Sequence, residues 1–391
     1  MPVKNRFAEL LPDIAAWRQD FHAHPELRFD LPRTTARVVE LLRSFGVDEI
    51  TEGVGKSGVV AVIKGRKSDS GRVVGFRADM DALPIHEATG LAHASTDDGK
   101  MHACGHDGHT SILLGAAQYL AETRNFDGTV VLAFQPAEEG GGGARAMVAD
   151  GLMDRWKIDE IYGLHNMPSL PVGQFAIKPG PLLAASDFFE IVVTGKGGHG
   201  AMPHMATDTT LASAAIVMAL QQIVARQVSA LGSAVLSVTG IQTDTMAHNV
   251  IPDSAKLTGT VRTLDKDVQT LVVERFHEVV TATATAYGAT AEINYIYGVG
   301  LTENAALNTD YAIAAAQSVA GEAGVQTDIE PIMGGEDFSE MLEERPGAFI
   351  MLGNGDSAGL HHPKYEFNDE AIPVGCSWFA ALAEQRLPLT S

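Results

Sequence analysis

GTVVLAF, residues 128–134, is the stretch that decides the fold class of this chain. It is largely apolar and short, which is typical of a strand buried in the interior of a sheet. Comparable runs occur on both sides of it, and segments with a helical period of apolar residues lie between them. Strands that alternate with helices predict an α/β domain with a mostly parallel central sheet. The expected strands are 58–64, 72–77, 128–134 and 160–165, and the expected helices are 5–22, 34–45, 110–123 and 144–150.

The pattern changes near residue 185, where a second set of elements begins. Its order is strand, helix, strand, strand, helix, strand, which is the split βαβ order of ferredoxin-like domains. The chain then returns to a helix over 305–323 and a short apolar strand over 348–352. We therefore predict a discontinuous larger domain of residues 1–185 and 297–391, with a domain of residues 186–296 inserted in it. The inserted elements are expected at 187–194, 207–227, 233–242, 254–262, 267–287 and 289–297.

The composition argues against several classes of function. The 391 residues include 28 Lys and Arg against 49 Asp and Glu, a net charge of −21, which argues against nucleic acid or an anionic membrane as a partner. Two cysteines, Cys104 and Cys376, are too few for a disulfide framework. The N-terminal residues are charged throughout and no run of about 18 apolar residues occurs, so we expect no signal peptide and no membrane helix. These features predict a cytoplasmic protein.

The densest group of potential metal ligands is MHACGHDGH, residues 101–109. Its Cys104 and His106 are two residues apart on a glycine-containing turn, so both side chains can point at one ion. Zinc and the neighbouring transition metals accept thiolate and imidazole ligands. The segment by itself is also compatible with an ordinary helix N-terminus capped by Asp107.

Two adjacent glutamates, Glu138 and Glu139 in QPAEEGGGG (residues 135–143), follow the strand at 128–134. Carboxylates at the end of a buried strand are costly unless a positive charge lies opposite them, and a metal ion supplies that charge. One glutamate can then bind the metal while its neighbour accepts a proton from a water molecule. The segment alone is also compatible with an acidic, solvated turn.

Three weaker signals fall at comparable places. His165 in GLHNM ends a predicted strand, Asp79 and Asp81 in FRADMDALPI follow another, and LHHP carries His361 and His362. Each alone is compatible with a structural role, but all the groups together supply thiolate, imidazole and carboxylate ligands for two metal ions. Most of them follow predicted strands, where open α/β sheets place their active sites.

Taken together, these motifs resemble a known family. The chain is similar to the bacterial hippurate hydrolase and N-acyl-amino-acid amidohydrolase subfamily of the aminoacylase/carboxypeptidase G superfamily of di-metal peptidases. The resemblance runs from HPEL at residues 24–27 to HHPKYEFND at residues 361–369. It implies a catalytic metallopeptidase domain and an inserted ferredoxin-like domain that serves for dimerisation or as a lid. The motifs are, in order, RADMDALPI, MHACGHDGH, QPAEEGGGGA, LHNMP, GKGGHGAMPH, HNVIPD and GGEDF.

By position in these motifs, the resemblance implies the residues of the metal site. Glu138 would be the general base, and Asp81 and Asp79 would lie behind the ligands. In the C-terminal motif His361 matches the relatives better than His362. The two divalent ions could be zinc, nickel or cobalt, which a cysteine ligand favours, or manganese, which carboxylate and histidine ligands tolerate. The implied ligands are Cys104, His106, Glu139, His165 and His361.

The resemblance also implies roles in and near the inserted domain. His199 in GKGGHG would support the oxyanion that forms on the substrate, often in the site of a partner subunit. Asn249 and Arg262 would hold the carboxylate or the amide of the substrate, and Arg suits a carboxylate through its bidentate fork. Gly335 in GGEDF would line the same pocket, whereas Glu336 receives no role. The implied assembly is a homodimer or a homotetramer.

The function that these expectations describe is metal-dependent hydrolysis of the amide bond of N-acyl amino acids, which releases a carboxylic acid and a free amino acid. Two alternatives stay open. One is a dipeptidase or carboxypeptidase of the same superfamily, and the other is a non-catalytic relative that only binds metal. The acyl group is open as well, since benzoyl, acetyl, longer acyl and indole-acetyl groups all suit an apolar pocket.

Overall fold

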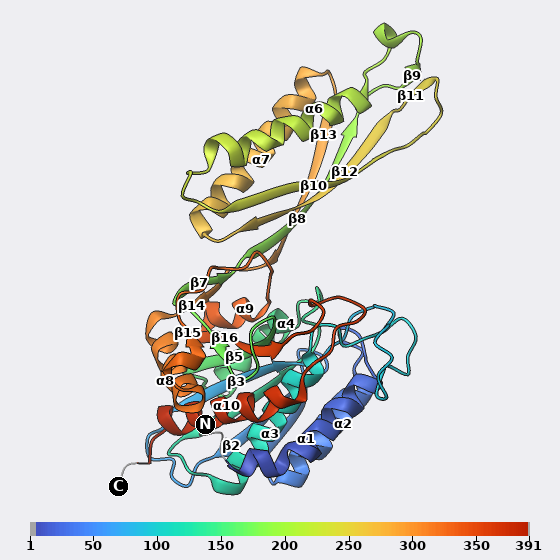
Figure 1. Ribbon diagram of the computed structural model, residues 1–391. Coiled ribbons are helices and arrows are strands. Elements are labelled where there is room, and N and C mark those ends of the chain that lie inside the picture. The colour runs from blue at the N-terminus through green and yellow to red at the C-terminus, as the bar shows by residue number, and fades with distance from the viewer. Residues whose placement is uncertain (1–4, 390–391) are drawn as a thin grey trace. The chain divides into compact units, whose positions relative to one another are not determined.

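A computed structural model describes residues 5–389, so the first four and last two residues of the predicted larger domain lie outside the described part. By their internal contacts the described residues form two compact units (Figure 1). The larger unit consists of the chain up to Leu182, of Glu303–Glu330 and of the chain from Asp337 onward. The inserted unit consists of Leu183–Thr302 and Pro331–Glu336.

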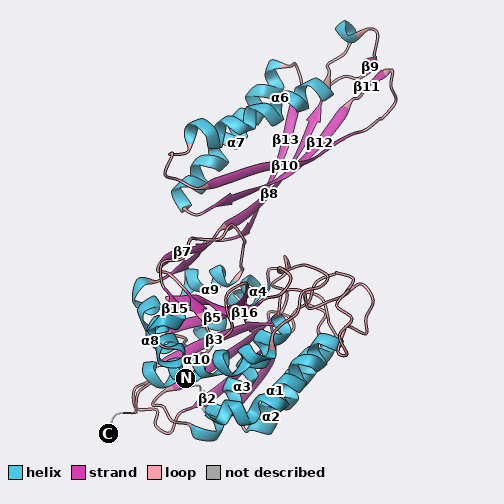
Figure 2. Ribbon diagram, viewed as in Figure 1, coloured by secondary structure: helices cyan, strands magenta, loops and turns pink. Residues whose placement is uncertain are grey.

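An eight-stranded sheet forms the centre of the larger unit (Figure 2). Its strand order is β1-β2-β4-β3-β5-β16-β6-β15, and the neighbours β4, β3, β5 and β16 are parallel. Antiparallel pairs join β1 to β2, β2 to β4 and β16 to β6. The sheet is thus mixed with a parallel centre, which confirms the predicted α/β fold. The strands are β1 Glu49–Val54, β2 Gly58–Lys64, β3 Val73–Asp79, β4 Thr129–Gln135, β5 Glu160–Pro168, β6 Phe175–Ala176, β15 Val325–Gln326 and β16 Gly347–Gly355, and β7 Gly180–Leu183 pairs separately with β14 Thr302–Asn304.

Helices bury the apolar core of the larger unit. α3 packs against α1 and α10, and α10 packs against α8. Large apolar side chains such as Phe76, Phe134 and Trp378 are fully buried in the core that these helices share with the sheet. The helices are α1 Asn5–Ala23, α2 Pro32–Phe45, α3 His106–Thr123, α4 Gly143–Ala149, α5 Leu152–Arg155, α8 Ala306–Ala320, α9 Phe338–Glu344 and α10 Ile372–Arg386.

Several elements of the larger unit differ from the sequence prediction. It misses the helices α5, α9 and α10 and the short strands β6, β7, β14 and β15. The strand β1 is also not predicted, because its sequence EITEGV lacks a run of apolar residues. Only Val54 of this strand is buried, which is typical of an edge strand with one neighbour. α3 begins at His106 instead of Thr110, because Gly105 takes φ = 90° and turns the chain directly into the helix. The earlier start puts His106 and His109 on the first turn of α3.

The long elements of the inserted unit follow the predicted order, and the short strands β9 and β11, which pair with each other, come in addition. The long strands form an antiparallel sheet in the order β10-β12-β8-β13. α6 and α7 pack on the sheet around a core that includes Phe189, Ile216 and Phe276. The elements are β8 Ala185–Thr194, β9 Gly198–His199, α6 Thr209–Gln222, the π-helical η2 Ile223–Gln227, β10 Ala234–Thr243, β11 Val250–Ile251, β12 Ser254–Thr263, α7 Lys266–Ala286 and β13 Thr290–Val299.

One segment of the inserted unit, Thr209–Gln227, is long and apolar enough to cross a membrane by length and composition alone. It comprises α6 and η2. Its side chains Ala212, Ile216 and Leu220 are buried in the core of the inserted unit, whereas Leu211 and Met218 are exposed. Packing in the core thus accounts for part of the apolar composition of the segment.

Glu160, at the start of β5, connects the C-terminal helix α10 to the sheet through hydrogen bonds. It accepts hydrogen bonds from Arg72 (2.9 Å), Arg386 (3.0 Å), Tyr162 (2.7 Å) and Asn308 (2.9 Å). We expect Glu160→Ala to lower the free energy of unfolding by about 2 kcal/mol, because it leaves buried donors without a partner. Urea unfolding followed by tryptophan fluorescence reports on this unit, since all three tryptophans of the chain lie in it.

The matched control is Glu52→Ala, which removes the exposed ion pair between Glu52 and Arg43. Exposed pairs contribute about 0–1 kcal/mol, so this variant should unfold close to the wild type. Equal destabilisation by the two substitutions would contradict the prediction that the hydrogen bonds of Glu160 stabilise the larger unit.

Candidate metal centre

The predicted ligands of the larger unit lie at one edge of its sheet, where the parallel strands end. Asp79 is the last residue of β3, Glu138 and Glu139 follow β4, and His165 lies in the second half of β5. Cys104 lies on the turn that leads into α3. Open α/β sheets place their sites at this edge, because the loops that follow neighbouring parallel strands converge there.

Potential ligand atoms approach one another closely at this edge. Cys104 Sγ lies 3.4 Å from His165 Nε2, and His361 Nε2 lies 3.3 Å from Glu139 Oε1. His106 Nε2 lies 4.0 Å from Glu139 Oε1. Cys104, His106 and His165 form one group whose ligand atoms lie within 4.8 Å of one another, and Cys104, Glu139 and His361 form another. Since Cys104 belongs to both groups, the arrangement is compatible with two adjoining cation sites.

Hydrogen bonds determine which ring nitrogen of two histidines faces this space. His106 Nδ1 donates to the carbonyl oxygen of Asp81 (2.8 Å), and His165 Nδ1 donates to that of Asn166 (2.7 Å). In each neutral ring Nε2 then carries the lone pair that can bind a metal. Among the described residues, buried His106 Nε2 and Glu139 Oε1 have no hydrogen-bond partner. A divalent cation would satisfy both atoms, so these residues fit a metal ion.

The electrostatics of the centre also favour a cation. Burial raises the pKa of the Cys104 thiol, so a thiolate at this position needs a positive charge beside it. Burial by itself lowers the pKa of the His106 imidazole, but Asp79, Cys104 and Asp81 together outweigh it and raise that pKa well above its ordinary 6.5. The centre therefore carries negative charge that a proton or a metal ion must balance.

Asp81 organises the turn that carries the two glutamates. Its carboxylate oxygens accept hydrogen bonds from the backbone N–H groups of Glu138 (2.9 Å) and Glu139 (3.2 Å). Ala137, directly before them, has φ = 53°, a left-handed conformation that is rare for a residue with a side chain and recurs at functional sites. The position of this turn thus depends on Asp81.

The two C-terminal histidines point to different partners. His361 has φ = 62°, and its backbone N–H donates to the carbonyl oxygen of Ala103 (2.8 Å) while its ring faces Glu139. His362 Nδ1 instead accepts a hydrogen bond from the backbone N–H of Lys364 (3.1 Å). Within residues 5–389, His361 belongs to a group of converging ligand atoms and His362 does not.

His199 and Asn249 are neighbours in the inserted unit. His199 pairs with Val250 in the β9–β11 ladder, and the backbone N–H of Gly200 donates to the carbonyl oxygen of Asn249 (2.8 Å). Both His199 and Asn249 are exposed. This end of the unit therefore offers an imidazole and an amide to a ligand or to another molecule.

Arg262 lies in β12 of the four-stranded sheet, at the end of the inserted unit where β8 begins. It pairs with Ser186 at the start of β8, and a Cβ placed on Gly335 would come within 2.9 Å of Ser186 Cβ. Ser186 and Thr194, the last residue of β8, are separated by roughly 25 Å at about 3.3 Å per residue. His199 lies beyond Thr194, so one small ligand cannot contact both His199 and Arg262 of the same inserted unit.

Arg77, a fully buried arginine in β3, is not among the site residues predicted from the sequence. It donates to Asp79 (2.8 Å), to Gln135 (2.8 Å) and to Asp337 of the GGEDF motif (3.2 Å). The arginine thereby neutralises two of the carboxylates near the centre. A positive charge within the apolar run VVGFRA is the feature of the sequence that could have indicated the role of Arg77. Burial of a charge is costly unless an opposite charge or hydrogen bonds compensate it.

A second missed group surrounds Asp107, the residue after His106. Asp107 Oδ2 lies 2.9 Å from His22 Nδ1 and 3.5 Å from an Arg18 nitrogen, and His22 Nε2 lies 3.3 Å from Glu87. Arg18 and His22 occupy the apolar, buried side of α1. A charged residue on the apolar face of a predicted helix indicates a buried polar partner, so Arg18 and His22 could have been identified from the sequence.

This group predicts a pH dependence of stability. Burial lowers the pKa of His22, but Asp107 and Glu87 outweigh it and raise that pKa from 6.5 to about 9. The protonated imidazole therefore stabilises the folded state fully below pH 6.5, and this stabilisation, at most about 3 kcal/mol, is lost as the pH rises through 9. Urea unfolding at pH 6.5 and pH 9.5 should show this loss for the wild type and a smaller one for His22→Gln. Equal losses would contradict the prediction.

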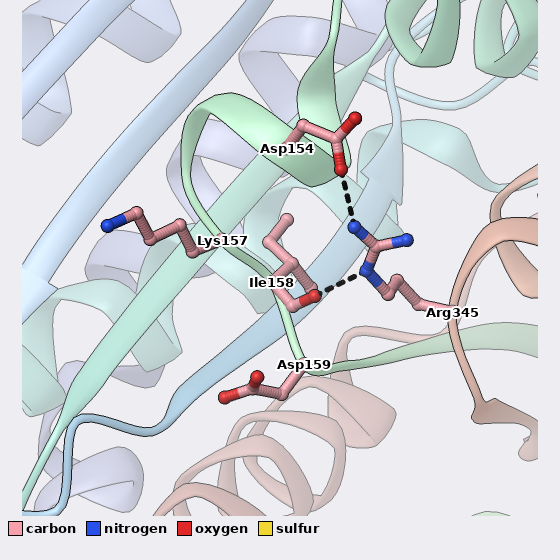
Figure 3. Close-up of a pocket in the computed structure, with 5 residues that line it drawn as sticks. All are labelled: Asp154, Lys157, Ile158, Asp159 and Arg345. Carbon is pink, nitrogen blue, oxygen red and sulfur yellow. Dashed lines mark hydrogen bonds and ion pairs between the residues drawn. The ribbon is translucent and has the colours of Figure 1, made fainter.

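A surface pocket lies elsewhere in the larger unit, lined by Asp154, Lys157, Ile158, Asp159 and Arg345 (Figure 3). It lies beside the start of β5, at the opposite end of the strand from His165. Arg345 is already bound to Asp154 (2.6 Å) and to the carbonyl oxygen of Ile158 (2.8 Å). The pocket contains none of the predicted site residues.

Comparisons with known proteins agree with the resemblance seen in the motifs. The family model described as peptidase family M20/M25/M40 matches residues 75–385. N-acetylcysteine deacetylase of Bacillus subtilis and hippurate hydrolase of Campylobacter jejuni are each 41% identical to the chain, with 94% of both sequences covered. A crystal structure of a Bacillus subtilis protein, described as a dinuclear metal binding peptidase from the M20 family, matches with a TM-score of 0.84 at 38% identity and covers 97% of this chain and 99% of that one. The chain therefore belongs to peptidase family M20/M25/M40.

Proposed function

We propose that this protein hydrolyses the amide bond of N-acyl amino acids and releases a carboxylic acid and a free amino acid. The observation that carries the proposal is the convergence of ligand atoms from four segments of the chain. Among the described residues, His106 Nε2 and Glu139 Oε1 accept no hydrogen bond, and they lie beside Cys104 and His165. Relatives with 41% identity are named for the removal of an acetyl group and for the hydrolysis of hippurate. Acetyl and benzoyl are therefore the first acyl groups to test.

Two divalent metal ions would be held at the candidate centre. When bound, such ions lower the pKa of a water molecule towards 7 and polarise the acyl carbonyl. The cysteine favours zinc, nickel or cobalt, and the carboxylate and histidines also tolerate manganese. Asp81 would keep the glutamate turn and His106 in place, and Asp79 would do the same from β3. The ligands would be Cys104, His106, Glu139, His165 and His361.

The side chains of the protein would move the protons and hold the substrate. Glu138 would accept a proton from the attacking water and return it to the leaving amine, because it adjoins the ligand Glu139 without being one itself. His199 would donate a hydrogen bond to the oxyanion that forms on the acyl carbon. Asn249 would hold the amide, and Gly335 would leave room for the substrate beside Arg262.

Arg262 is suited to bind the carboxylate of the substrate. Its half-buried guanidinium contacts the carbonyl oxygens of Asp187 (3.4 Å) and Val261 (3.1 Å) and the hydroxyl of Thr260. Among the described residues none of its hydrogen bonds goes to a carboxylate, so its charge remains available for an anion.

We infer that two copies of the chain combine to form each site, as a homodimer or within a homotetramer. His199 and Arg262 lie at opposite ends of one inserted unit, so a substrate held by Arg262 can meet His199 only from a second copy. Exposed apolar side chains on α6 and on the edge strand β10, among them Leu211, Met218 and Ile241, offer a surface that the second copy would cover. Neither nucleic acid nor a membrane is proposed as a partner, and the cytoplasm is the proposed location.

The test is amide hydrolysis after removal of metal by a chelator and reconstitution with Zn, Mn, Co or Ni. Hippurate, N-acetyl amino acids and dipeptides are supplied, and the released amino acid is measured. Metal-dependent release from N-acyl amino acids is the expected result. Release from dipeptides alone would favour a dipeptidase or carboxypeptidase, and no release from a folded protein that binds two ions would favour a non-catalytic relative.

A further inference from the structure

Four buried side chains behind the candidate metal centre form one chain of hydrogen bonds. Asp79 accepts from His109 Nδ1 (2.7 Å), His109 Nε2 lies 2.9 Å from the backbone nitrogen and 3.0 Å from the side-chain nitrogen of Asn166, and Asn166 Oδ1 lies 2.7 Å from the Tyr365 hydroxyl. Asn166 Nδ2 also donates to the carbonyl oxygen of Cys104 (2.6 Å). Each of the four side chains belongs to a residue that is at most 1% exposed.

The direction of every hydrogen bond in this network follows from the donors available. A backbone N–H can only donate, so His109 Nε2 must be an acceptor and the proton of the ring must lie on Nδ1, facing Asp79. Both N–H groups of the Asn166 amide are then used, by His109 and by Cys104. Its oxygen must accept, and the Tyr365 hydroxyl must donate to it.

The network joins three segments that carry proposed metal ligands. Asn166 holds the carbonyl oxygen of Cys104 and is itself the residue after His165. Tyr365 lies four residues after His361, in the C-terminal loop. Asn166 therefore connects the turn before α3, the end of β5 and the C-terminal loop through one amide group.

The network is closely packed on the side of Gly105 and on the side of the neighbouring imidazoles. A Cβ on Gly105 would lie 2.2 Å from Asn166 Nδ2 and 2.5 Å from the Tyr365 hydroxyl. The ring of His109 packs against His165 at 4.5 Å and against His106 at 5.5 Å between centroids. Any shift of the His109 ring would therefore move the two imidazoles.

We propose that His109, Asn166 and Tyr365 are positioning residues that set the separation of Cys104 and His165 for metal binding, an inference that rests on the metal centre of the proposed function. The competing role for His109 is that of a ligand, because its ring also lies within a group formed with Asp79 and His106. The hydrogen bonds argue against that role, since both nitrogens of His109 are already occupied. A metal could bind His109 only by displacing Asp79 or Asn166.

The test uses Co²⁺ as the probe on the metal-free full-length protein. The readouts are the dissociation constant of Co²⁺ and the thiolate-to-cobalt absorption band, which reports directly on Cys104. Tyr365→Phe removes one hydroxyl and keeps the ring. We expect it to weaken Co²⁺ binding about 10- to 100-fold, the usual loss when a group behind a ligand is removed, and to shift the thiolate band. The amide oxygen of a glutamine can replace Nε2 as acceptor, so His109→Gln should bind Co²⁺ more tightly than His109→Leu.

The matched control is Tyr162→Phe, since the Tyr162 hydroxyl is equally buried but bonds to Glu160 at the far end of β5. This variant should lose stability and keep the Co²⁺ affinity of the wild type. Wild-type affinity and an unchanged thiolate band in Tyr365→Phe would overturn the positioning role, and so would loss of one of two bound ions in both His109 variants, because that marks a ligand. Failure of the wild type itself to bind Co²⁺ would instead refute the metal centre.

Discussion

Glu138→Gln is expected to lose about 10²- to 10⁴-fold in kcat, while the metal content of the protein stays that of the wild type. Glutamine has the shape of glutamate but cannot accept a proton, and proton transfer by a positioned side chain contributes about this factor. Glu138 is not among the proposed ligands, so its replacement leaves the donor set of the centre intact. The measurement is steady-state hydrolysis of an N-acyl amino acid by the metal-reconstituted variant, together with its metal content.

The control for this result is Glu303→Gln, which changes an exposed glutamate of β14 and should leave kcat unchanged. Turnover at the wild-type rate in Glu138→Gln would remove Glu138 from the role of general base. Loss of metal together with turnover would reassign it as a ligand.

His199→Ala is expected to lower kcat by about 10²- to 10³-fold without loss of metal, the effect of removing one oxyanion donor. The matched control is His204→Ala, because His204 is also exposed and lies five residues further along the same end of the inserted unit. Depletion of metal in His199→Ala would make His199 a ligand, and unchanged kcat would exclude it from the reaction.

Mixing two inactive variants tests whether His199 acts in the site of a second copy. In a dimer of one Glu138→Gln chain and one His199→Ala chain, a shared site would combine the intact Glu138 of one copy with the intact His199 of the other. Random reassociation should then restore about a quarter of the wild-type activity, because half of the dimers are mixed and each has one complete site. No recovery, from chains shown to exchange, would place His199 in the site of its own chain.

Much of the fold can be predicted from local sequence alone. Runs such as GTVVLAF specify their strands because an apolar segment of that length is stable only when it is buried on both faces. The βαββαβ order of the inserted unit can be predicted in the same way, because segments with the apolar spacing of a strand alternate with segments that have the apolar spacing of a helix. An edge strand such as β1 cannot be predicted in this way. It contacts only one neighbouring strand, so few of its side chains are buried and its sequence needs no apolar pattern.

Some residues of the candidate centre could likewise be predicted from local sequence, and others could not. Cys104, Glu139 and His165 could be singled out because their motifs occur together in one chain, although each motif alone is compatible with a structural role. The contributions of His109, Asn166, Tyr365 and Arg77 could not, because a hydrogen bond between residues far apart in the chain follows no local period.

By itself, the sequence determined the kinds of element, their order and the types of ligand, since these depend on side-chain chemistry and on spacing along one segment. The tertiary structure decided that His361 and not His362 faces Glu139, and that His199 and Arg262 lie too far apart to share a ligand within one unit. Such distances depend on strand order and register, which bring together residues from distant parts of the chain.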